Sequence, residues 1–245
     1  MNIKKALIVG GSNGIGLAIA NCLSEDGCRV TVVDRAPLDG NATDGIAFEQ
    51  FDLTSKDYSV FDKYHDVDIL MITAGFGHLA LFQDIPEEEI NRYFEVNTIP
   101  VIRIIKRFYD RLQSDSVFRV GVMVSIAGYM SSPFFSVYSA TKAALRTFIE
   151  SVNVELEKGG SGNRILNVSP GSIKGTKFDG NSANTLQLTM PLAREIISHL
   201  EQGDDLFIPK YDEVFKTVLE RYHNDFREEG RHSYDYKVAS GRIKK

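Results

Sequence analysis

Cysteine is scarce in this chain of 245 residues. Cys22 and Cys28 are its two cysteines, and they form neither a disulfide framework nor a metal-binding pattern. The five histidines are scattered without the spacing of metal ligands, so we expect no metal site. Basic residues form no block and the formal net charge is −5, which argues against a nucleic-acid partner.

Long apolar runs are also missing. No stretch approaches the roughly 18 apolar residues that identify a membrane-spanning helix. The run Ala6–Val9 near the N-terminus is too short for the core of a signal peptide. With 43% hydrophobic and 25% charged residues, the chain is long enough for a sizeable core. We therefore expect a single cytoplasmic domain over residues 1–245, with no membrane partner.

The N-terminal part of the chain has the pattern of a strand, a glycine-rich turn, a helix and a second strand. Ala6–Val9 is a continuous apolar run, typical of a strand buried on both faces. Gly10, Gly14 and Gly16 follow directly, and such a turn lets a pyrophosphate approach the backbone at a helix N-terminus. Asp34 ends the second strand, where an acid binds a ribose 2′-hydroxyl. The alternative is a glycine-rich turn without a ligand.

A second pattern runs from Ser125 to Lys142. Ser125 follows a short β-branched run that predicts a buried strand, and further strands are predicted at 46–51, 67–72 and 164–168. If Pro133 opens a helix, Tyr138 and Lys142 share one face of it. The ammonium then favours the phenolate, so we expect the pKa of Tyr138 to lie below its ordinary value near ~10. Such a tyrosine exchanges protons at neutral pH; the alternative is a surface Tyr and Lys.

Together, the spacings Gly10-x-x-x-Gly14-x-Gly16 and Tyr138-x-x-x-Lys142 resemble the short-chain dehydrogenase/reductase family, in its compact single-domain branch. The resemblance covers residues 5 to about 176. It implies an α/β fold, a three-layer Rossmann-type doubly wound parallel sheet of about seven strands with helices on both faces. It also implies NAD(P)-dependent hydride transfer that interconverts an alcohol and a carbonyl.

The resemblance assigns roles to four residues. Ser125 matches the catalytic serine, and its hydroxyl would donate a hydrogen bond to the developing oxyanion. Tyr138 would exchange a proton with the substrate oxygen, while Lys142 would lower its pKa and bind the nicotinamide ribose. Asn97 matches an asparagine that holds a water leading to the lysine, and we expect Pro100 to kink its helix and free backbone for that water. The alternative is that neighbouring backbone satisfies a buried Asn97.

The resemblance also implies a dinucleotide site, built from the glycine turn and from segments that follow the strands. The residues expected there are Gly10, Ser12, Asn13, Gly14, Ile15, Gly16, Asp34, Arg35, Asp52, Leu53, Ala74, Gly75, Tyr138, Lys142, Pro170, Gly171, Ile173 and Thr176. Asp34 favours NAD because its carboxylate repels a 2′-phosphate, but Arg35 is able to accept the phosphate, so NADP is the alternative. Asp52 contacts adenine or caps a helix that starts near Ser55. Thr176 stands one position after the place where the family often has a threonine. Either Thr176 takes the role of that threonine, or this loop differs from the loop of the family.

The C-terminal part departs from the family, because its usual glycine-rich last strand and loop are missing. Residues 176–190 are rich in small polar residues and are expected to be the lid over the substrate. A helix over 191–200, a strand over 205–209 and a helix over 211–226 are predicted next. The tail 228–245 is expected to be frayed or to contact another subunit, in a homodimer or homotetramer such as the family forms.

The substrate is a small-molecule alcohol or carbonyl compound of unspecified identity. Five apolar residues are candidates for the lining of its pocket, with packing in the protein interior as the alternative: Tyr129, Met130, Phe134, Phe135 and Phe178. Two rival functions stay open at this point. One is a dinucleotide-binding sensor or scaffold without turnover, against which Ser125, Tyr138 and Lys142 argue. The other is a nucleotide-sugar-modifying relative, a class that is usually longer.

Overall fold

The computed structural model describes residues 4–176, 185–241 and 243. Within them, seven strands form one sheet in which every pairing is parallel, in the order β3-β2-β1-β4-β5-β6-β7. The strands are β1 (Lys5–Val9), β2 (Arg29–Asp34), β3 (Ala47–Gln50), β4 (Ile69–Ile72), β5 (Arg119–Met123), β6 (Ile165–Val168) and β7 (Leu206–Phe207). This confirms the predicted doubly wound sheet. The strand order reverses between β1 and β4, where such sheets bind ligands at their carboxyl ends.

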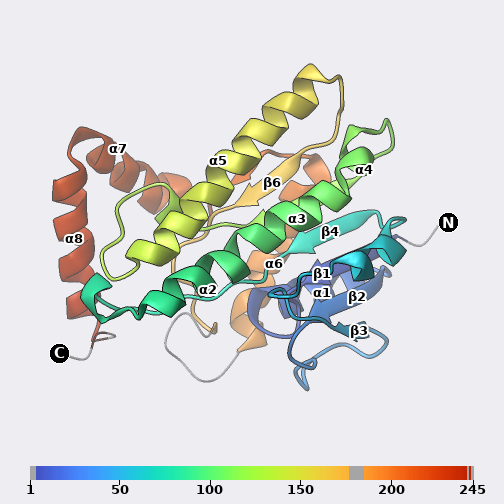
Figure 1. Cartoon of the computed structure of the whole chain (residues 1–245), viewed down its shortest axis with the longest axis horizontal. Helices are drawn as coiled ribbons and strands as arrows, with labels where there is room; N and C mark the ends of the chain where they lie inside the picture. The colour runs from blue at the N-terminus through green and yellow to red at the C-terminus, as the bar shows by residue number, and fades with distance from the viewer. Residues whose placement is uncertain (1–3, 177–184, 242, 244–245) are drawn as a thin grey trace.

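Helices cover both faces of the sheet (Figure 1). They are α1 (Gly14–Glu25), α2 (Glu87–Asn97), α3 (Ile99–Arg107), α4 (Tyr109–Gln113), α5 (Ser136–Lys158), α6 (Leu186–Gln202), α7 (Lys216–Asn224) and α8 (Phe226–Ala239). Shorter turns of helix are η1 (Ser59–Tyr64), η2 (Phe82–Asp84), η3 (Ile126–Gly128) and the π-helix η5 (Tyr211–Phe215). None of the helices in these segments is long and apolar enough to cross a bilayer.

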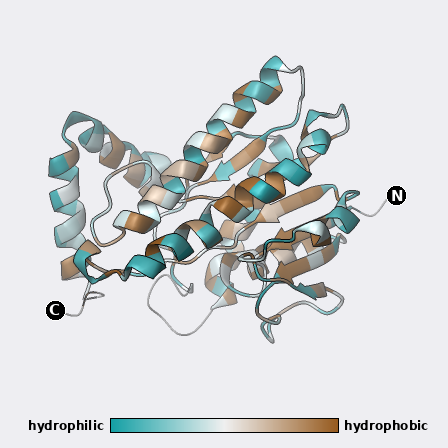
Figure 2. Ribbon diagram, in the orientation of Figure 1, coloured by the Kyte–Doolittle hydropathy of each residue, from teal (hydrophilic) through white to brown (hydrophobic). Residues whose placement is uncertain are grey.

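The strands are apolar on both faces, so the sheet is the centre of two cores. Leu7 and Val9 of β1 pack with residues of α3 and α5. Ala6 and Ile8, which alternate with them, pack with residues of α1 and α6. Figure 2 shows the hydrophobic strands between helices whose outward residues are more polar. This arrangement explains the continuous apolar runs in the sequence.

Two helix boundaries differ from the sequence prediction. Helix α6 begins at Leu186, so the last part of the predicted 176–190 loop is helical. Leu186 and Met190 pack against the α1 core, and this burial outweighs the polar composition and Pro191 within the helix. The rest of the predicted lid, residues 177–184, lies outside the described residues.

Helix α5 begins at Ser136, so the prediction that Pro133 opens it is wrong. The reason is the conformation of Phe134, whose φ of 67° is left-handed and cannot be part of the helix. The Phe135 N–H donates to the Ser132 carbonyl (2.9 Å), which closes a β-turn with Pro133 at its second position.

The C-terminal segment leaves the sheet after β7 and forms the helices α7 and α8. The helix predicted over 211–226 is present as η5 and α7. Helix α8 was not predicted. It packs on the loop before α5 of its own chain, through bonds from Ser131 and Lys237, whereas the sequence suggested fraying or contact with another subunit. Figure 1 shows both helices beside the N-terminal end of α5.

Candidate active site

The glycine turn after β1 packs so closely on the end of β4 that side chains have no room there. A Cβ on Gly10, whose φ is 87°, would lie 2.3 Å from the Ala74 backbone nitrogen. A Cβ on Gly16 would lie 2.4 Å from Thr73 Oγ1 and 2.5 Å from the Gly10 carbonyl oxygen. Gly14, with a φ of 57°, opens α1. The turn therefore presents bare backbone and a helix N-terminus, as a pyrophosphate requires.

The glycine turn is joined to the end of β2 through Asp34. Ser12 donates to Asp34 Oδ2 from its backbone N–H (3.1 Å) and from Oγ (2.7 Å). The Ala36 N–H donates to Asp34 Oδ1 (3.2 Å), and Asn13 Nδ2 donates to Ser12 Oγ (3.1 Å). These contacts hold the carboxylate at the carboxyl edge of β2. Arg35 is exposed beside it.

Asp52 caps a turn instead of the helix start that the sequence left open as its alternative role. Its Oδ1 accepts from the Thr54 N–H (2.8 Å) and Oγ1 (2.9 Å), and these bonds lower the pKa of the carboxyl. The helix expected near Ser55 is wrong, because η1 begins only at Ser59. Leu53 is partly buried against the α3–α5 core.

Asn97 is fully buried and fastens the segment after β4 to α2. Its Oδ1 accepts from the Phe76 N–H (2.9 Å), while Nδ2 donates to the Phe76 carbonyl (2.9 Å) and to Thr141 Oγ1 (3.3 Å). Neighbouring backbone therefore satisfies its amide. Helices α2 and α3 are separated at Thr98 (φ −121°, ψ −61°), next to Pro100 as predicted.

Gly75 brings Asn97 and Lys142 together. A Cβ on Gly75 would lie 3.3 Å from Asn97 Oδ1 and 3.4 Å from Lys142 Nζ. The three residues come from the end of β4, from α2 and from α5. A side chain at position 75 would therefore contact both polar groups, most closely the Asn97 carboxamide.

Ser125, Tyr138 and Lys142 meet at the carboxyl end of β5. All three are buried, at 9%, 8% and 2% exposure, and the side chains of Ser125 and Tyr138 are hydrogen-bonded. Ser125 Oγ also accepts from the Ala127 N–H (3.1 Å). Lys142 Nζ donates to the Met123 carbonyl (2.8 Å) and lies 5.7 Å from the centroid of the Tyr138 ring.

Burial dominates the electrostatics of this group. It raises the pKa of Tyr138, and the hydrogen bond with Ser125 offsets only part of this effect. Burial also lowers the pKa of Lys142 to about 7. The prediction that Lys142 lowers the pKa of Tyr138 is therefore wrong for this structure. Desolvation of the phenolate outweighs the attraction to an ammonium that is itself only partly protonated at neutral pH.

The turn after β6 completes the site. The Pro170 carbonyl accepts from the Ile126 N–H (3.1 Å), which ties the turn to η3. A Cβ on Gly171 would lie 2.6 Å from Cζ of Phe215, so this glycine directly faces the C-terminal segment. Thr176 Oγ1 donates to the Ile173 carbonyl (2.8 Å) and closes the turn from within.

Comparisons with known proteins agree with this geometry. The profile of the short chain dehydrogenase family matches residues 4–187. The chain belongs to the short-chain dehydrogenase family. An uncharacterized oxidoreductase of Bacillus subtilis, YvaG, is 32% identical over 181 residues, 69% of this chain and 68% of that protein. A sorbitol dehydrogenase of Cereibacter sphaeroides is 29% identical over 194 residues, 74% of each chain.

Solved structures show the same fold. A short-chain dehydrogenase from Streptomyces avermitilis has a TM-score of 0.76 at 22% identity, over 96% of this chain and 98% of its own. The predicted family and enzyme class are confirmed: this short-chain dehydrogenase is an NAD(P)-dependent oxidoreductase. The sensor and nucleotide-sugar alternatives are therefore not retained.

The structure of this dehydrogenase places the aromatic residues that were expected near the substrate. Tyr129 and Met130 pack against Ile126, as does Phe215, so the packing alternative holds for them. Rings of Phe135 and Tyr138 are in contact, with centroids 5.4 Å apart. Phe178 lies outside the described residues.

Some residues of the site were not predicted. Thr73 Oγ1 donates to the Gly10 carbonyl (2.9 Å), and Thr98 Oγ1 donates to the Thr141 carbonyl (3.1 Å). A Cβ on Gly128 would lie 2.8 Å from the backbone of Lys142, so this glycine lets η3 touch α5. The position of Gly128 in the sequence, between Ser125 and Tyr138, was the signal that could have indicated its role. No local pattern marks Thr73 or Thr98, because their partners are distant in the sequence.

Proposed function

We propose that Tyr138 is the general acid and base of this dehydrogenase, which interconverts an alcohol and a carbonyl compound. The observation that carries the proposal is the buried, hydrogen-bonded pair of Ser125 and Tyr138 at the carboxyl edge of β5. Both hydroxyls lie next to the edge of the sheet at which open α/β folds bind their ligands. A substrate oxygen between them would accept one hydrogen bond from each.

The residues present fit a nicotinamide dinucleotide. Its pyrophosphate would be held by the N-terminus of α1 at Gly14, where a Cβ would meet no atom within 4 Å, and its adenosine ribose by Asp34. Lys142, whose ammonium lies next to Gly75 at the end of β4, would bond the nicotinamide ribose. When bound, the cofactor supplies or accepts the hydride.

The protein residues handle the proton. In the direction of reduction, the Tyr138 hydroxyl gives its proton to the substrate oxygen, and Ser125 Oγ donates a hydrogen bond to the same oxygen. Because burial raises the pKa of Tyr138, the neutral phenol is the resting form at pH 7. Lys142, whose pKa is near neutrality, would return a proton to Tyr138 after the transfer.

We propose NAD as the preferred cofactor, with NADP as the alternative. The Asp34 carboxylate, fixed by Ser12 and Ala36, would accept bonds from a free ribose and repel a 2′-phosphate. Arg35 favours the alternative, and so do structural neighbours solved with NADP. One is a dehydrogenase from Burkholderia cenocepacia, at 19% identity and a TM-score of 0.72.

A titration of nicotinamide fluorescence tests the cofactor proposal. Asp34→Ala should lose the preference for NADH over NADPH, a change on the order of tenfold or more for one carboxylate–hydroxyl interaction. Asp44→Ala, an exposed acid in the following loop, is the matched control and should keep the preference. Tighter binding of NADPH by the unmodified protein would transfer the selecting role to Arg35.

Steady-state kinetics test the role of Tyr138. The assay follows the nicotinamide absorbance with sorbitol, a panel of secondary alcohols and the reactive diketone phenanthrenequinone. Tyr138→Phe should lower kcat by about 10² to 10⁴, the range for loss of a general acid or base. Ser139→Ala changes a partly exposed neighbour, whose hydroxyl donates to the Ser136 carbonyl, and should keep full activity. A Tyr138→Phe protein with normal kcat would refute the proposal.

We further propose that residues 1–245 form a single domain, and that the part of the expected 176–190 lid that precedes α6 covers the substrate. We propose a cytoplasmic homodimer or homotetramer as the working form. Exposed apolar side chains on α3 and α5, Ile99 (47% exposed) and Val154 (57%), support contact between subunits. Light scattering during gel filtration tests this, and a monomer at all concentrations would refute it.

A further inference from the structure

The β-turn that precedes the catalytic helix has an unfavourable conformation. Its third residue, Phe134, has a φ of 67°, a position that turns of this geometry usually give to glycine or asparagine. The ring of Phe134 is nevertheless buried, at 5% exposure. A bulky residue keeps such a conformation only where the surrounding structure holds it.

Helix α8 supplies the contacts that hold this turn. Lys237 Nζ donates to Ser132 Oγ (2.9 Å) and to the Pro133 carbonyl (2.7 Å), so it binds two consecutive residues of the turn. The ring of Tyr234, one helical turn earlier, packs on Phe134 with centroids 4.6 Å apart. On the other side, the Ala80 N–H donates to the Phe134 carbonyl (3.0 Å).

The lysine is well fixed in this position. It is buried at 8% exposure, and Ser233 Oγ accepts a third bond at 3.0 Å. Its ammonium also lies 5.4 Å from the centroid of the Phe135 ring. Two of these three oxygens belong to the turn and one to α8 itself, so the ammonium joins the helix to the turn. Burial of an ammonium costs free energy that such bonds must offset.

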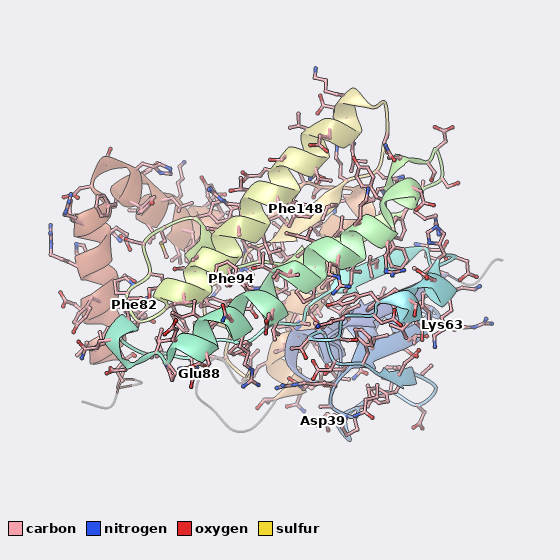
Figure 3. All side chains as sticks on the ribbon, viewed as in Figure 1. Asp39, Lys63, Phe82, Glu88, Phe94 and Phe148 are labelled. Atoms are coloured by element: carbon pink, nitrogen blue, oxygen red, sulfur yellow. The ribbon has the colours of Figure 1, made fainter. Side chains whose placement is uncertain are left out.

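The base of α8 is anchored as well. Ser131 Oγ donates to the Phe226 carbonyl (3.1 Å) at the start of the helix. Glu229, buried at 3% exposure, accepts from Arg221 Nε (2.5 Å) and joins α8 to α7. The helix therefore meets the loop before α5 at both of its ends. Figure 3 shows α8 near the labelled Phe82 and on the opposite side of the view from Lys63.

The turn leads directly into the residue that does the chemistry. The Phe135 carbonyl accepts from the Ser139 N–H (2.7 Å), which starts the first turn of α5. Tyr138 is the third residue of that helix, and its ring touches Phe135. A shift of the turn therefore moves the first turn of α5 and the phenol with it.

We propose that Lys237 is a positioning residue for the reaction, because it holds the Ser132–Phe135 turn and thereby fixes Tyr138 against Ser125. The inference rests on the proposed function of Tyr138. It assigns the C-terminal helix a part in the chemistry, although that helix is about 100 residues away in the sequence from the turn it binds. Gly14 and Asp34, which would hold the pyrophosphate and the adenosine ribose, lie on other elements. Most contacts to the dinucleotide should therefore survive a shift of the first turn of α5, while turnover should fall.

Hydrogen exchange tests, without a substrate, whether Lys237 holds the Ser132–Phe135 turn. Lys237→Met keeps the apolar stem and removes the ammonium. The amides of Phe135 and Ser139 should exchange on the order of tenfold faster than in the unmodified protein, because their bonds close the turn and the first helical turn. Lys216→Met, an exposed lysine of α7, is the control and should leave both amides unchanged. Unchanged exchange in Lys237→Met would overturn the inference.

Kinetics test the functional half with the same alcohol and diketone panel. Lys237→Met should lower kcat on the order of 10- to 100-fold, as expected for misplacement of a catalytic group, and leave the Kd of NADH unchanged. If this variant does not fold, Ser132→Ala is the substitute, because it removes one acceptor of the Lys237 ammonium. It should also lower kcat and leave the Kd of NADH unchanged, with a smaller loss of kcat. Equal losses of NADH binding and kcat would overturn the inference, because they indicate general damage.

The two proposals fail in different ways. If Tyr138→Phe is inactive while Lys237→Met matches Lys216→Met in kcat and exchange, only the positioning role of Lys237 is refuted. If Tyr138→Phe keeps full activity, the proposed function is refuted and the inference with it. Faster exchange in Lys237→Met with reduced kcat and normal NADH binding supports both.

Discussion

Two turns next to the candidate active site contain residues in the left-handed conformation, and they accommodate this conformation differently. The turn after β1 uses glycine at Gly10 and Gly14, with φ of 87° and 57°. The turn before α5 uses Phe134, with φ of 67°, and fastens it with Lys237 and Tyr234 of α8. The first turn avoids the strain by using glycine, although Asp34 and Thr73 also bond to it. The second turn keeps a bulky residue in this conformation and is held by contacts with a distant helix. Glycine thus shapes the proposed dinucleotide cradle, while tertiary contacts support the turn that leads to Tyr138.

The largest effect should come from breaking the glycine turn. Gly10→Ala introduces a Cβ only 2.3 Å from the Ala74 backbone at a positive φ. The clash and the strain should lower the free energy of unfolding by roughly 2–4 kcal/mol and abolish measurable NADH binding. Urea unfolding and fluorescence titration measure the two effects.

Gly40→Ala is the control for this change. Its Cβ would meet no atom within 4 Å, and its φ is ordinary. Stability and NADH binding should therefore match the unmodified protein. A Gly10→Ala protein that behaved like Gly40→Ala would show that the close packing at β4 does not matter for the cradle.

A smaller effect, dependent on pH, should come from Lys142. Its pKa is lowered from 10.5 to about 7 in the folded protein, so between these values the unfolded chain binds more protons. Stability therefore rises with pH across this window. Between pH 7 and 9 the gain from this one group should be about 2 kcal/mol. Above pH 10, the raised pKa of Tyr138 acts in the opposite direction, so the measurement ends at pH 9.

Urea unfolding of the unmodified protein and of Lys142→Met isolates this contribution. The variant should be more stable than the unmodified protein at pH 7, and the difference should shrink by pH 9. Lys216→Met, which changes an exposed lysine, should follow the unmodified protein at both values. If the stability of Lys142→Met depended on pH in the same way as that of the unmodified protein, the result would show that the Lys142 ammonium is not desolvated.

The smallest effect should come from the ring that supports Phe134. Tyr234→Ala removes the aromatic contact at 4.6 Å but leaves the Lys237 bonds, so stability should fall by about 1 kcal/mol. Thermal unfolding measures the change, and Tyr234→Phe should restore it because the ring is kept. If Tyr234→Phe lost as much as Tyr234→Ala, the hydroxyl group rather than the ring would support the turn.

The contrast between the turns also explains what the sequence predicts. Gly10, Gly14, Gly16 and the apolar run before them are local signals, and the strand, turn and helix follow from them directly. The pairing of Ser125 with Tyr138 was predictable only through the family resemblance, since no local rule joins residues thirteen positions apart across a turn. The geometry then places them together as expected.

Other features depend on contacts between distant segments. Pro133 is a sound signal for the start of a helix, but the left-handed Phe134 moves that start to Ser136. The turn that contains Phe134 is bonded by Lys237 of α8, which lies 105 positions after Ser132 in the chain. Likewise, Phe215 against Gly171 has no local pattern. The sequence also predicted the wrong direction for the pKa of Tyr138. The spacing of Tyr138 and Lys142 shows that a charge is close, but it does not show that both groups are buried.

The most direct test of the central claim is a single-turnover measurement on Tyr138→Phe. The protein is saturated with the preferred reduced dinucleotide, mixed with phenanthrenequinone, and followed by nicotinamide absorbance. If Tyr138 is the general acid, we expect a dinucleotide Kd equal to that of the unmodified protein and a hydride-transfer rate about 10²- to 10⁴-fold lower. An unchanged transfer rate would contradict it, because the proton would then come from a group other than the tyrosine that the second turn positions.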